Sequence, residues 1–332
     1  MTGQQQSEGV SKLTVWLSGL LPFERAAEVL EQVGRMHTSR GSVWQQSKLW
    51  GSEFQGQEEK LQNMAAEVDL RNGVVPGEEK AAKRMGVSMD GGMIHIREEG
   101  WKEVKIGCVF DVEQEIIVDE QTQEETESGC ARNNSYVAYL GEPEMFGQKV
   151  WAEAKHRGWT SAADTQVVGD GAAWIWNLVG EHFYDSAQVV DWYHGKEHLA
   201  HAAELLHGEG TPAMHSWLKE EETTLFLGHA NEIADRIRQQ AQGKSCQDEL
   251  LREAGYFEHH QHRMNYLDMR IQGWVIGSGM VESGAKQFKA RLAGPGMHWS
   301  RAGAERLLPV RSAILSDRFD QAWRLAYNSP QI

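Results

Sequence analysis

Three acidic residues lie beside glycines at the ends of apolar segments. Asp90 follows the apolar run in VSMDGG, and Asp170 follows the one in VVGDGA. Glu282 lies in IGSGMVESG, where an amphipathic helix is expected to begin. Glycine leaves room for a ligand beside a carboxylate at the rim of a sheet. Because Mg²⁺ prefers oxygen ligands, the order Asp, Asp, Glu predicts a magnesium site for phosphodiester cleavage.

Cleavage of a phosphodiester requires an attacking oxygen, a leaving oxygen in line with it, and neutralisation of the charge on phosphorus. Two Mg²⁺ ions roughly 3.5–4 Å apart can supply all of these. We expect Asp90 to bridge both ions, with Asp170 and Glu282 each completing one coordination shell. Mn²⁺ is the expected substitute for Mg²⁺. The Asp-Gly pair also marks turns, so neither aspartate is specific by itself.

The predicted helix that carries Glu282 is basic on one side. Val281, Ala285 and Phe288 form an apolar stripe, and Glu282 shares a neighbouring stripe with Lys286 and Lys289. That arrangement puts an acid beside two candidate phosphate-binding lysines. The alternative is an ordinary Glu–Lys pair at i,i+4, which stabilises a helix by a few tenths of a kcal/mol.

The elements that would position these acids follow a recognisable order. Residues 87–90, 104–110 and 136–140 read as strands, with residues 87–90 joined to 94–96 by a turn at the glycine pair. A helix over 145–158, a strand over 166–170, a helix from Ala173, a strand over 187–191 and a helix over 196–206 follow. This order predicts an α/β fold with an RNase H-like mixed sheet, in which the ends of the first and fourth strands lie side by side.

The rest of the chain divides by composition. We expect a disordered tail over 1–11, a helix-turn-helix-like region over 12–52 and a helical linker over 53–84. The catalytic core would span 85–208 and 271–325, interrupted by a helical insertion over 209–270 and followed by a tail over 326–332. In the helix-turn-helix interpretation, Arg40 and Lys48 would face DNA. Helical hairpins that merely pack are the alternative.

The charge is unevenly distributed along the 332 residues. The net charge of −15 disfavours a nucleic-acid partner, yet residues 283–324 carry eight basic side chains against three acids. Arg291 and Arg301 in this segment are candidate DNA contacts. An acidic run over 111–127 is expected to form the turn between the second and third strands. The opposite interpretation is a solvated acidic loop and an ordinary charged helical tail.

Other function classes find little support in the composition. No apolar run approaches the roughly 20 residues that span a membrane, and the N-terminal residues lack the apolar middle of a signal peptide, so a cytoplasmic location is expected. The three cysteines include no CxxC pair, which disfavours disulfides and cysteine-built zinc sites. His194 and His198 have metal-ligand spacing but no third ligand in view.

Several segments in order resemble the motifs of DDE transposases of bacterial insertion sequences, most closely the ISKra-type branch. The segments are VSMDGG with GWKEVKIGCVF, VVGDGAAWIW, VVDWYHGKEHL, RMNYLDMRIQGWVIGSGMVESG and RLAGPGMHWS. The resemblance implies an RNase H-like catalytic domain with a helical insertion, and Mg²⁺-dependent DNA strand cleavage and joining. By position, Asp90, Asp170 and Glu282 match the acidic triad of the family.

The resemblance also implies partners and supporting residues. The partners would be double-stranded DNA, as terminal inverted repeats and target, and a second copy of the chain in the synaptic complex. The protein would act in the cytoplasm, at the nucleoid. Asp191 and His194 look like an Asp-x-x-His motif that supports the acids; read alone, they are a strand-end cap and a half-buried histidine. The region before the helical hairpin is shorter than in this branch, which puts recognition of the element's ends in doubt.

Thirteen tryptophans offer candidate base contacts. Those near the motif segments are Trp174, Trp176, Trp192, Trp274 and Trp299. Base–aromatic stacking contributes roughly 1–3 kcal/mol per base. Trp299 is the first candidate, because it follows a Gly-Pro-Gly loop and precedes Arg301.

Three other functions stay open. A glycosidase also uses paired acids and tryptophans, but it needs neither a metal nor a basic helix. A catalytically idle DNA-binding derivative of a transposase would keep the acids without the reaction. Another RNase H-like nuclease would cleave nucleic acid without strand transfer.

Overall fold

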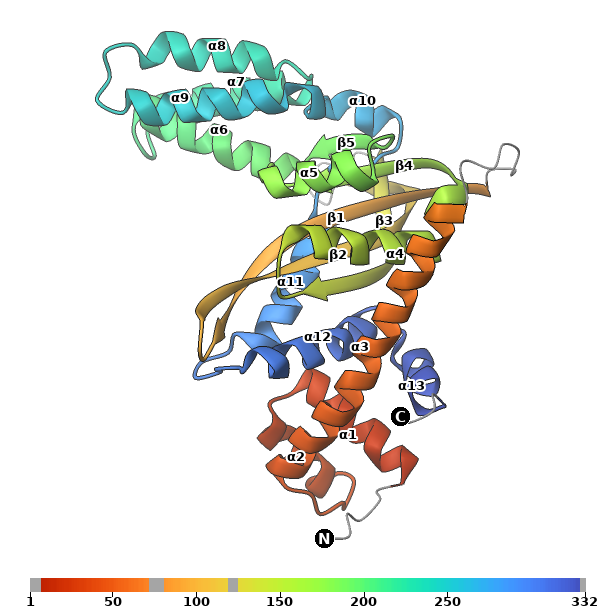
Figure 1. The fold of residues 1–332 in the computed structure, drawn as a ribbon. Helices are drawn as coiled ribbons and strands as arrows, with labels where there is room; N and C mark the ends of the chain where they lie inside the picture. The colour runs from red at the N-terminus through yellow and green to blue at the C-terminus, as the bar shows by residue number, and fades with distance from the viewer. Residues whose placement is uncertain (1–6, 72–80, 119–124, 329–332) are drawn as a thin grey trace.

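The protein forms one mixed sheet with helices on both faces (Figure 1). The computed structural model describes residues 7–71, 81–118 and 125–328. The strands are β1 (Ala81–Ile96), β2 (Gly100–Val118), β3 (Glu125–Tyr139), β4 (Ala162–Gly169) and β5 (Ala187–Val190), in the order β3-β2-β1-β4-β5. β1, β2 and β3 pair antiparallel, whereas β4 and β5 run parallel to β1. The predicted α/β class is confirmed, and the sheet order is consistent with an RNase H-like topology.

β1 differs from the prediction, because it does not turn at Gly91 and Gly92. It is a single strand of 16 residues, paired with β2 from Met85↔Asp111 to Ile96↔Gly100. The glycines serve close packing instead: a Cβ added at Gly91 would collide with the Glu103 side chain, and one at Gly92 would lie 2.8 Å from Lys289 Cε. Asp90 therefore lies inside a strand rather than at its end.

The acidic run also differs from the prediction of a turn. Its first part continues β2, where the Asp111 and Glu115 side chains pair with Arg157 and Arg132 of neighbouring segments. Its last part begins β3 at Glu125. Long, strongly paired strands thus absorb most of the acids, and residues 119–124 lie outside the described ranges.

Two buried clusters sandwich the sheet. On one face, Met85, Val87 and Met89 pack with α4 (Pro143–His156), α5 (Ala173–His182) and α6 (Trp192–His207). A short 3₁₀ turn, η1 (Trp159–Ser161), leads from α4 into β4. On the other face, Ile94, Ile106 and Phe110 pack against α11 (Gly279–Leu292) and α12 (Arg301–Leu315). Side chains alternate along a strand, so Asp90 faces the same side as Ile94, toward α11.

The N-terminal helices pack at one end of the molecule (Figure 1). They are α1 (Glu8–Leu20), α2 (Phe23–Gln32) and α3 (Arg40–Arg71), and Leu17, Leu30 and Val43 form their shared core. α3 is one helix of 32 residues that crosses the expected boundary at residue 52 and reaches the sheet. α1 begins at Glu8, within the expected tail. α13 (Phe319–Tyr327) packs Trp323 against Trp50 of α3.

A helical region separates α6 from the loop before α11. It contains α7 (Pro212–Phe226), α8 (Ala230–Ala241), α9 (Gln247–His260), the 3₁₀ turn η2 (Gln261–Arg263) and α10 (Tyr266–Ile271). This agrees with the helical content expected for residues 209–270. α6 to α9 lie together beyond the β5 edge of the sheet (Figure 1).

Candidate functional site

Asp90, Asp170 and Glu282 line a single cavity. It has a volume of about 540 Å³ and includes Tyr193, His194 and Glu197 of α6 and Ser278 and Gly279 at the start of α11. All three acids are half-buried. Segments that are distant in sequence therefore bring the predicted acids to one place.

Both aspartates lie at the same end of the β1–β4 pairing. The β1–β4 pairing ends at Ser88↔Val168, so Asp90 lies two residues beyond it in β1 and Asp170 two residues beyond it after β4. Asp170 Oδ1 accepts a hydrogen bond from Ala172 N at 2.8 Å, across Gly171 with its φ of 103°. A side chain would be strained at that φ, which explains the glycine. Tyr256 Oη donates to the Asp170 carbonyl at 3.2 Å and fixes the turn.

Buried polar contacts hold the loop before α11 against the sheet. The Gln166 side chain of β4 donates to Val275 O at 2.8 Å and accepts from Val275 N at 2.9 Å. Asp191, which is 0% exposed, accepts from Ser278 N. Ser278 Oγ then donates to Glu282 Oε1 at 2.9 Å. These hydrogen bonds hold the loop before α11 against the sheet and orient the Glu282 carboxylate.

The electrostatics of the cavity centre on Asp90. Burial raises the pKa of the Asp90 carboxyl, and the charges of Asp170 and Glu282 raise it further. The Gly91 N–H, 2.6 Å from Asp90 Oδ1, and the Lys289 ammonium act in the opposite direction. Mutual repulsion among clustered carboxylates is what a bound cation would relieve.

The donor set fits Mg²⁺, which takes carboxylate oxygens and keeps several waters. Among the residues that the structure describes, however, no His, Cys, Asp or Glu side chains are gathered in a ready-made group of three around one metal position. Asp90, Asp170 and Glu282 each accept a hydrogen bond from a neighbouring backbone N–H or hydroxyl group through one carboxylate oxygen. The carboxylates share a cavity and would have to turn toward one another to share an ion.

Lys286 and Lys289 are exposed beside the cavity. Lys286 Nζ lies 3.8 Å from Glu282 Oε2, and its side chain is 79% exposed. The Lys289 side chain passes over Gly92. The basic stripe therefore adjoins the acids, and the i,i+4 pair of the alternative interpretation also forms.

Asp191 and His194 have different surroundings. Asp191 is the N-cap of α6 and accepts from His194 N at 2.7 Å. His194 lines the cavity and lies 3.7 Å from Glu197 Oε2. His198 instead contacts Glu253 at 2.6 Å. The sequence alone did not single out Tyr193 and Glu197. The available signal was that these two residues are four positions apart in the helix that follows Asp191.

Arg291 is a correction to the expected DNA contacts. It is 2% exposed, its Nε donates to Ser18 O of α1 at 2.8 Å, and its guanidinium lies over the Phe23 and Trp299 rings. Burial lowers the pKa of Arg291 to about 9, and the charge of Arg311 contributes. Ser18, Phe23 and Trp299 enclose this residue, so its guanidinium is not available on the surface.

The remaining candidates lie at the surface to different degrees. Trp299 is partly buried, edge-on to Phe23, with its Nε1 donating to Leu292 O at 2.8 Å, so little of its ring is free for a base. Arg301 makes a bidentate pair with Glu99. Arg40 and Lys48 are exposed on α3, with Lys48 Nζ 5.6 Å from the Trp44 ring.

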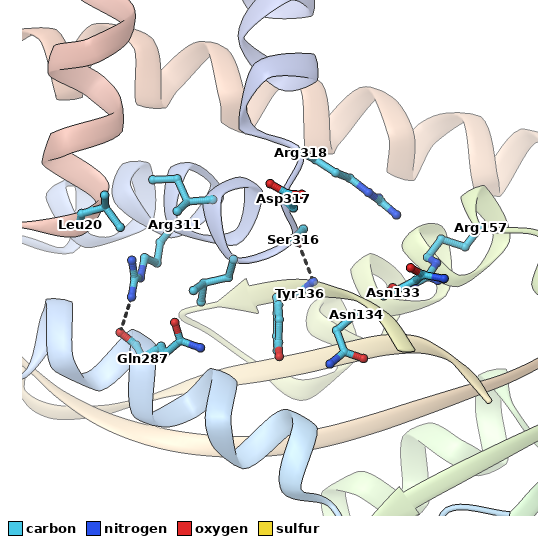
Figure 2. Close-up of a pocket in the computed structure, with 12 residues that line it drawn as sticks. Leu20, Asn133, Asn134, Tyr136, Arg157, Gln287, Arg311, Ser316, Asp317 and Arg318 are labelled. Atoms are coloured by element: carbon cyan, nitrogen blue, oxygen red, sulfur yellow. Dashed lines mark hydrogen bonds between the residues drawn. The ribbon is translucent and has the colours of Figure 1, made fainter. Parts of the chain in front are cut away.

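A second cavity, of about 680 Å³, shares no lining residue with the first (Figure 2). Its three arginines already have partners. Arg157 pairs with Asp111 and Arg318 with Glu153, whereas Arg311 donates to the carbonyls of Gly19 and Gln287. These contacts join α1, α12 and the sheet, so we assign the arginines a structural role.

The chain matches none of the protein-family models to which it was compared, and no curated protein resembles it significantly. The resemblance of its motifs to DDE transposases therefore stays a prediction. In the part of the chain that the structure describes, no helix has the length and apolar character to cross a membrane.

Proposed function

We propose that this protein is a DDE transposase of a bacterial insertion sequence, which cleaves DNA strands at the element ends and transfers them in a Mg²⁺-dependent reaction. One observation carries the proposal: Asp90, Asp170 and Glu282, contributed by β1, the end of β4 and α11, line one cavity. The sheet order β3-β2-β1-β4-β5 supports an RNase H-like core, with residues 209–270 as a helical insertion.

In this proposal Asp90, Asp170 and Glu282 hold Mg²⁺, or Mn²⁺ in its place. Bound there, the metal supplies an activated oxygen nucleophile and neutralises charge on the scissile phosphate. The chain itself positions the carboxylates. Ser278 orients Glu282 through its hydroxyl, and Asp191 fixes Ser278 through its backbone N–H.

The exposed lysines beside the cavity provide phosphate contacts. Lys286 and Lys289 lie one and two turns after Glu282, where a DNA backbone that enters the cavity would pass. Lys286 would exchange its contact with Glu282 for a phosphate once Glu282 binds metal. Local positive charge decides such contacts, because interactions beyond about 8–10 Å are screened at physiological salt.

The proposed substrate is double-stranded DNA: the terminal inverted repeats of the element, and its target. α2 and α3 would act as a helix-turn-helix-like unit, with Arg40 and Lys48 exposed on the second helix. Two ends must be brought together, so we expect a homo-oligomer in the synaptic complex. The reaction would take place in the cytoplasm, on the nucleoid.

The test uses the DNA that flanks this reading frame in its genome. Purified full-length protein should nick a labelled duplex of that DNA at the element end in Mg²⁺, but not in EDTA. A duplex of equal length and random sequence serves as control. Binding of the ends without nicking would favour an idle DNA-binding derivative. Equal nicking of both duplexes without joined products would favour another RNase H-like nuclease. In a separate assay, cleavage of a glycoside in EDTA would favour a glycosidase.

A further inference from the structure

A third cavity, of about 810 Å³, adjoins the acid cavity. The two share Tyr193 and Gly279 in their linings. Tyr193 is 65% exposed, and its ring rests against Gly277, where an added Cβ would lie 3.3 Å from the ring. Tyr193 thus forms the wall between the acids and this neighbouring space, which we call the aromatic cavity.

The aromatic cavity combines ring faces with positive charge. Trp192, Tyr193 and Phe226 contribute rings, and Trp192 and Phe226 meet edge-to-face with centroids 5.5 Å apart. Arg132 and Arg270 contribute guanidinium groups, and none of the described lining residues is acidic.

Arg270 is incompletely satisfied. Its Nε is buried and has no hydrogen-bond partner among the described residues, while its guanidinium lies 5.9 Å from the centre of the Phe226 ring. That nitrogen is closed off from solvent, so an occupant of the cavity would contact the remaining N–H groups of the half-buried Arg270 guanidinium. Arg132, by contrast, already pairs with Glu115.

We propose that the aromatic cavity binds one unpaired nucleotide of the DNA strand whose scissile phosphate lies at the acids. The inference rests on the proposed function and adds a feature of its substrate. The base would stack on Tyr193 and Phe226, and its polar edge or phosphate would accept from Arg270. A nucleotide has both an aromatic face and a negative charge, which is the combination that this lining complements. The shared Tyr193 wall would place that nucleotide next to the cleavage position.

The experiment measures stacking without cleavage. Full-length protein in EDTA is titrated onto a duplex with a short single-stranded tail that carries one 2-aminopurine, whose fluorescence is quenched when it stacks on an aromatic ring. A blunt duplex with the 2-aminopurine paired inside is the reference. Wild type should quench the tail and bind the tailed duplex more tightly than the blunt one.

The variants separate stacking from folding. Tyr193→Ala and Phe226→Leu should each lose most of the quenching and weaken binding of the tailed duplex by roughly 5- to 150-fold, the range expected when one base–aromatic stack is removed. Phe226→Leu keeps an apolar side chain in place. Tyr184→Ala, which removes a 74% exposed ring outside the cavity, should leave quenching unchanged.

Unchanged quenching in folded Tyr193→Ala and Phe226→Leu proteins would overturn the proposal, and so would equal losses of affinity for blunt and tailed duplexes. The two proposals fail separately. Quenching without Mg²⁺-dependent nicking by wild type would overturn the transposase and keep the nucleotide site. Mg²⁺-dependent nicking without quenching would overturn the nucleotide site and keep the transposase proposal.

Discussion

The buried carboxylate of Asp191 accepts a hydrogen bond from the backbone N–H of Ser278, 87 residues later in the chain. Its other oxygen accepts from His194 N at 2.7 Å and caps α6. Ser278 is in turn the N-cap position of α11, and its hydroxyl donates to Glu282. One side chain therefore ties the end of β5 to the helix that carries the third acid. The interpretation of Asp191 as a cap at the end of a strand is confirmed by its bond with His194 N, and its role in supporting the acids stays a prediction.

Replacing Asp191 by Asn tests this contact. Asn caps helices about as well as Asp, so the α6 cap should survive, but its amide N–H₂ would face the N–H of Ser278. We expect unfolding free energy to fall by about 1–3 kcal/mol. Strand cleavage should fall as well, because Glu282 loses its orientation, while the Kd for DNA stays the same. Chemical unfolding and nicking assays measure both; Asp185→Asn, at an exposed position, should change neither.

The close approach of α3 and α12 gives a stability prediction with an internal control. A Cβ on Gly51 would lie about 2.5 Å from the Arg306 carbonyl oxygen, whereas one on Gly56, in the same helix, meets nothing within 4 Å. Gly51→Ala should destabilise the protein by about 1–3 kcal/mol, as overpacking does. Gly56→Ala should stabilise it by roughly 0.5–1 kcal/mol, because Ala is the better helix former. Equal effects in urea unfolding would mean that the two helices do not pack as described.

Acid should destabilise the protein through His260. Burial lowers the pKa of His260 to about 4, and the positive charges of neighbouring side chains contribute to this lowering. These side chains are His198, His259, His262 and Arg263. The Tyr256 ring packs against the His260 ring. The unfolded pKa is about 6.5, so between these values the unfolded chain binds more protons than the folded one. The contribution of His260 is therefore complete above pH 6.5 and is lost as the pH falls toward 4.

The size of this loss is roughly 3 kcal/mol, because the folded and unfolded pKa values differ by about 2.5 units and each unit contributes about 1.4 kcal/mol. Urea unfolding of wild type and His260→Phe at a series of pH values measures it. The variant keeps a ring in the site but has no titration, so its stability should fall less between pH 6.5 and 4. Parallel curves for the two proteins would contradict the prediction.

The basic stripe on α11 should contribute to DNA binding. With Lys286 and Lys289 both changed to Ala, the slope of log K against log salt should flatten by about 0.9 for each phosphate that the protein no longer neutralises. Lys219→Ala with Arg252→Ala removes two exposed cations from the helical region and is the control, with a smaller expected change. A slope that the α11 variant leaves unaltered would show that these lysines only pair with helix acids.

Local patterns in the sequence predicted much of the fold. The apolar run before Asp170, the start of α5 at Ala173 and the strand from Ala187 were all correctly placed, because each is marked by glycine or by a change of periodicity. The glycine pair after Asp90 was wrongly interpreted as a turn. The reason for those glycines is the passage of Glu103 and Lys289 side chains, which come from other elements and leave no local signal.

The candidate site, like the fold, was predicted only in part. Local context singled out Asp90, Asp170 and Glu282, and the structure gathers them around one cavity, although their joint role stays a prediction. The environment of Arg291 could not be foreseen, since Ser18, which accepts its hydrogen bond, is 273 residues away. The aromatic cavity is likewise built from distant segments, namely β3, α6, α7, α10, the loop before α11 and the start of α11.

The central claim is that three carboxylates act together in strand cleavage, and single substitutions test it most directly. Mg²⁺-dependent nicking of the flanking DNA is measured for wild type, Asp90→Asn, Asp170→Asn and Glu282→Gln, with Asp185→Asn and Glu249→Gln as exposed controls. We expect each of the three cavity variants to fold and bind DNA like wild type and to lose nicking, while both controls retain it. A folded cavity variant that nicks DNA at the wild-type rate would contradict the account.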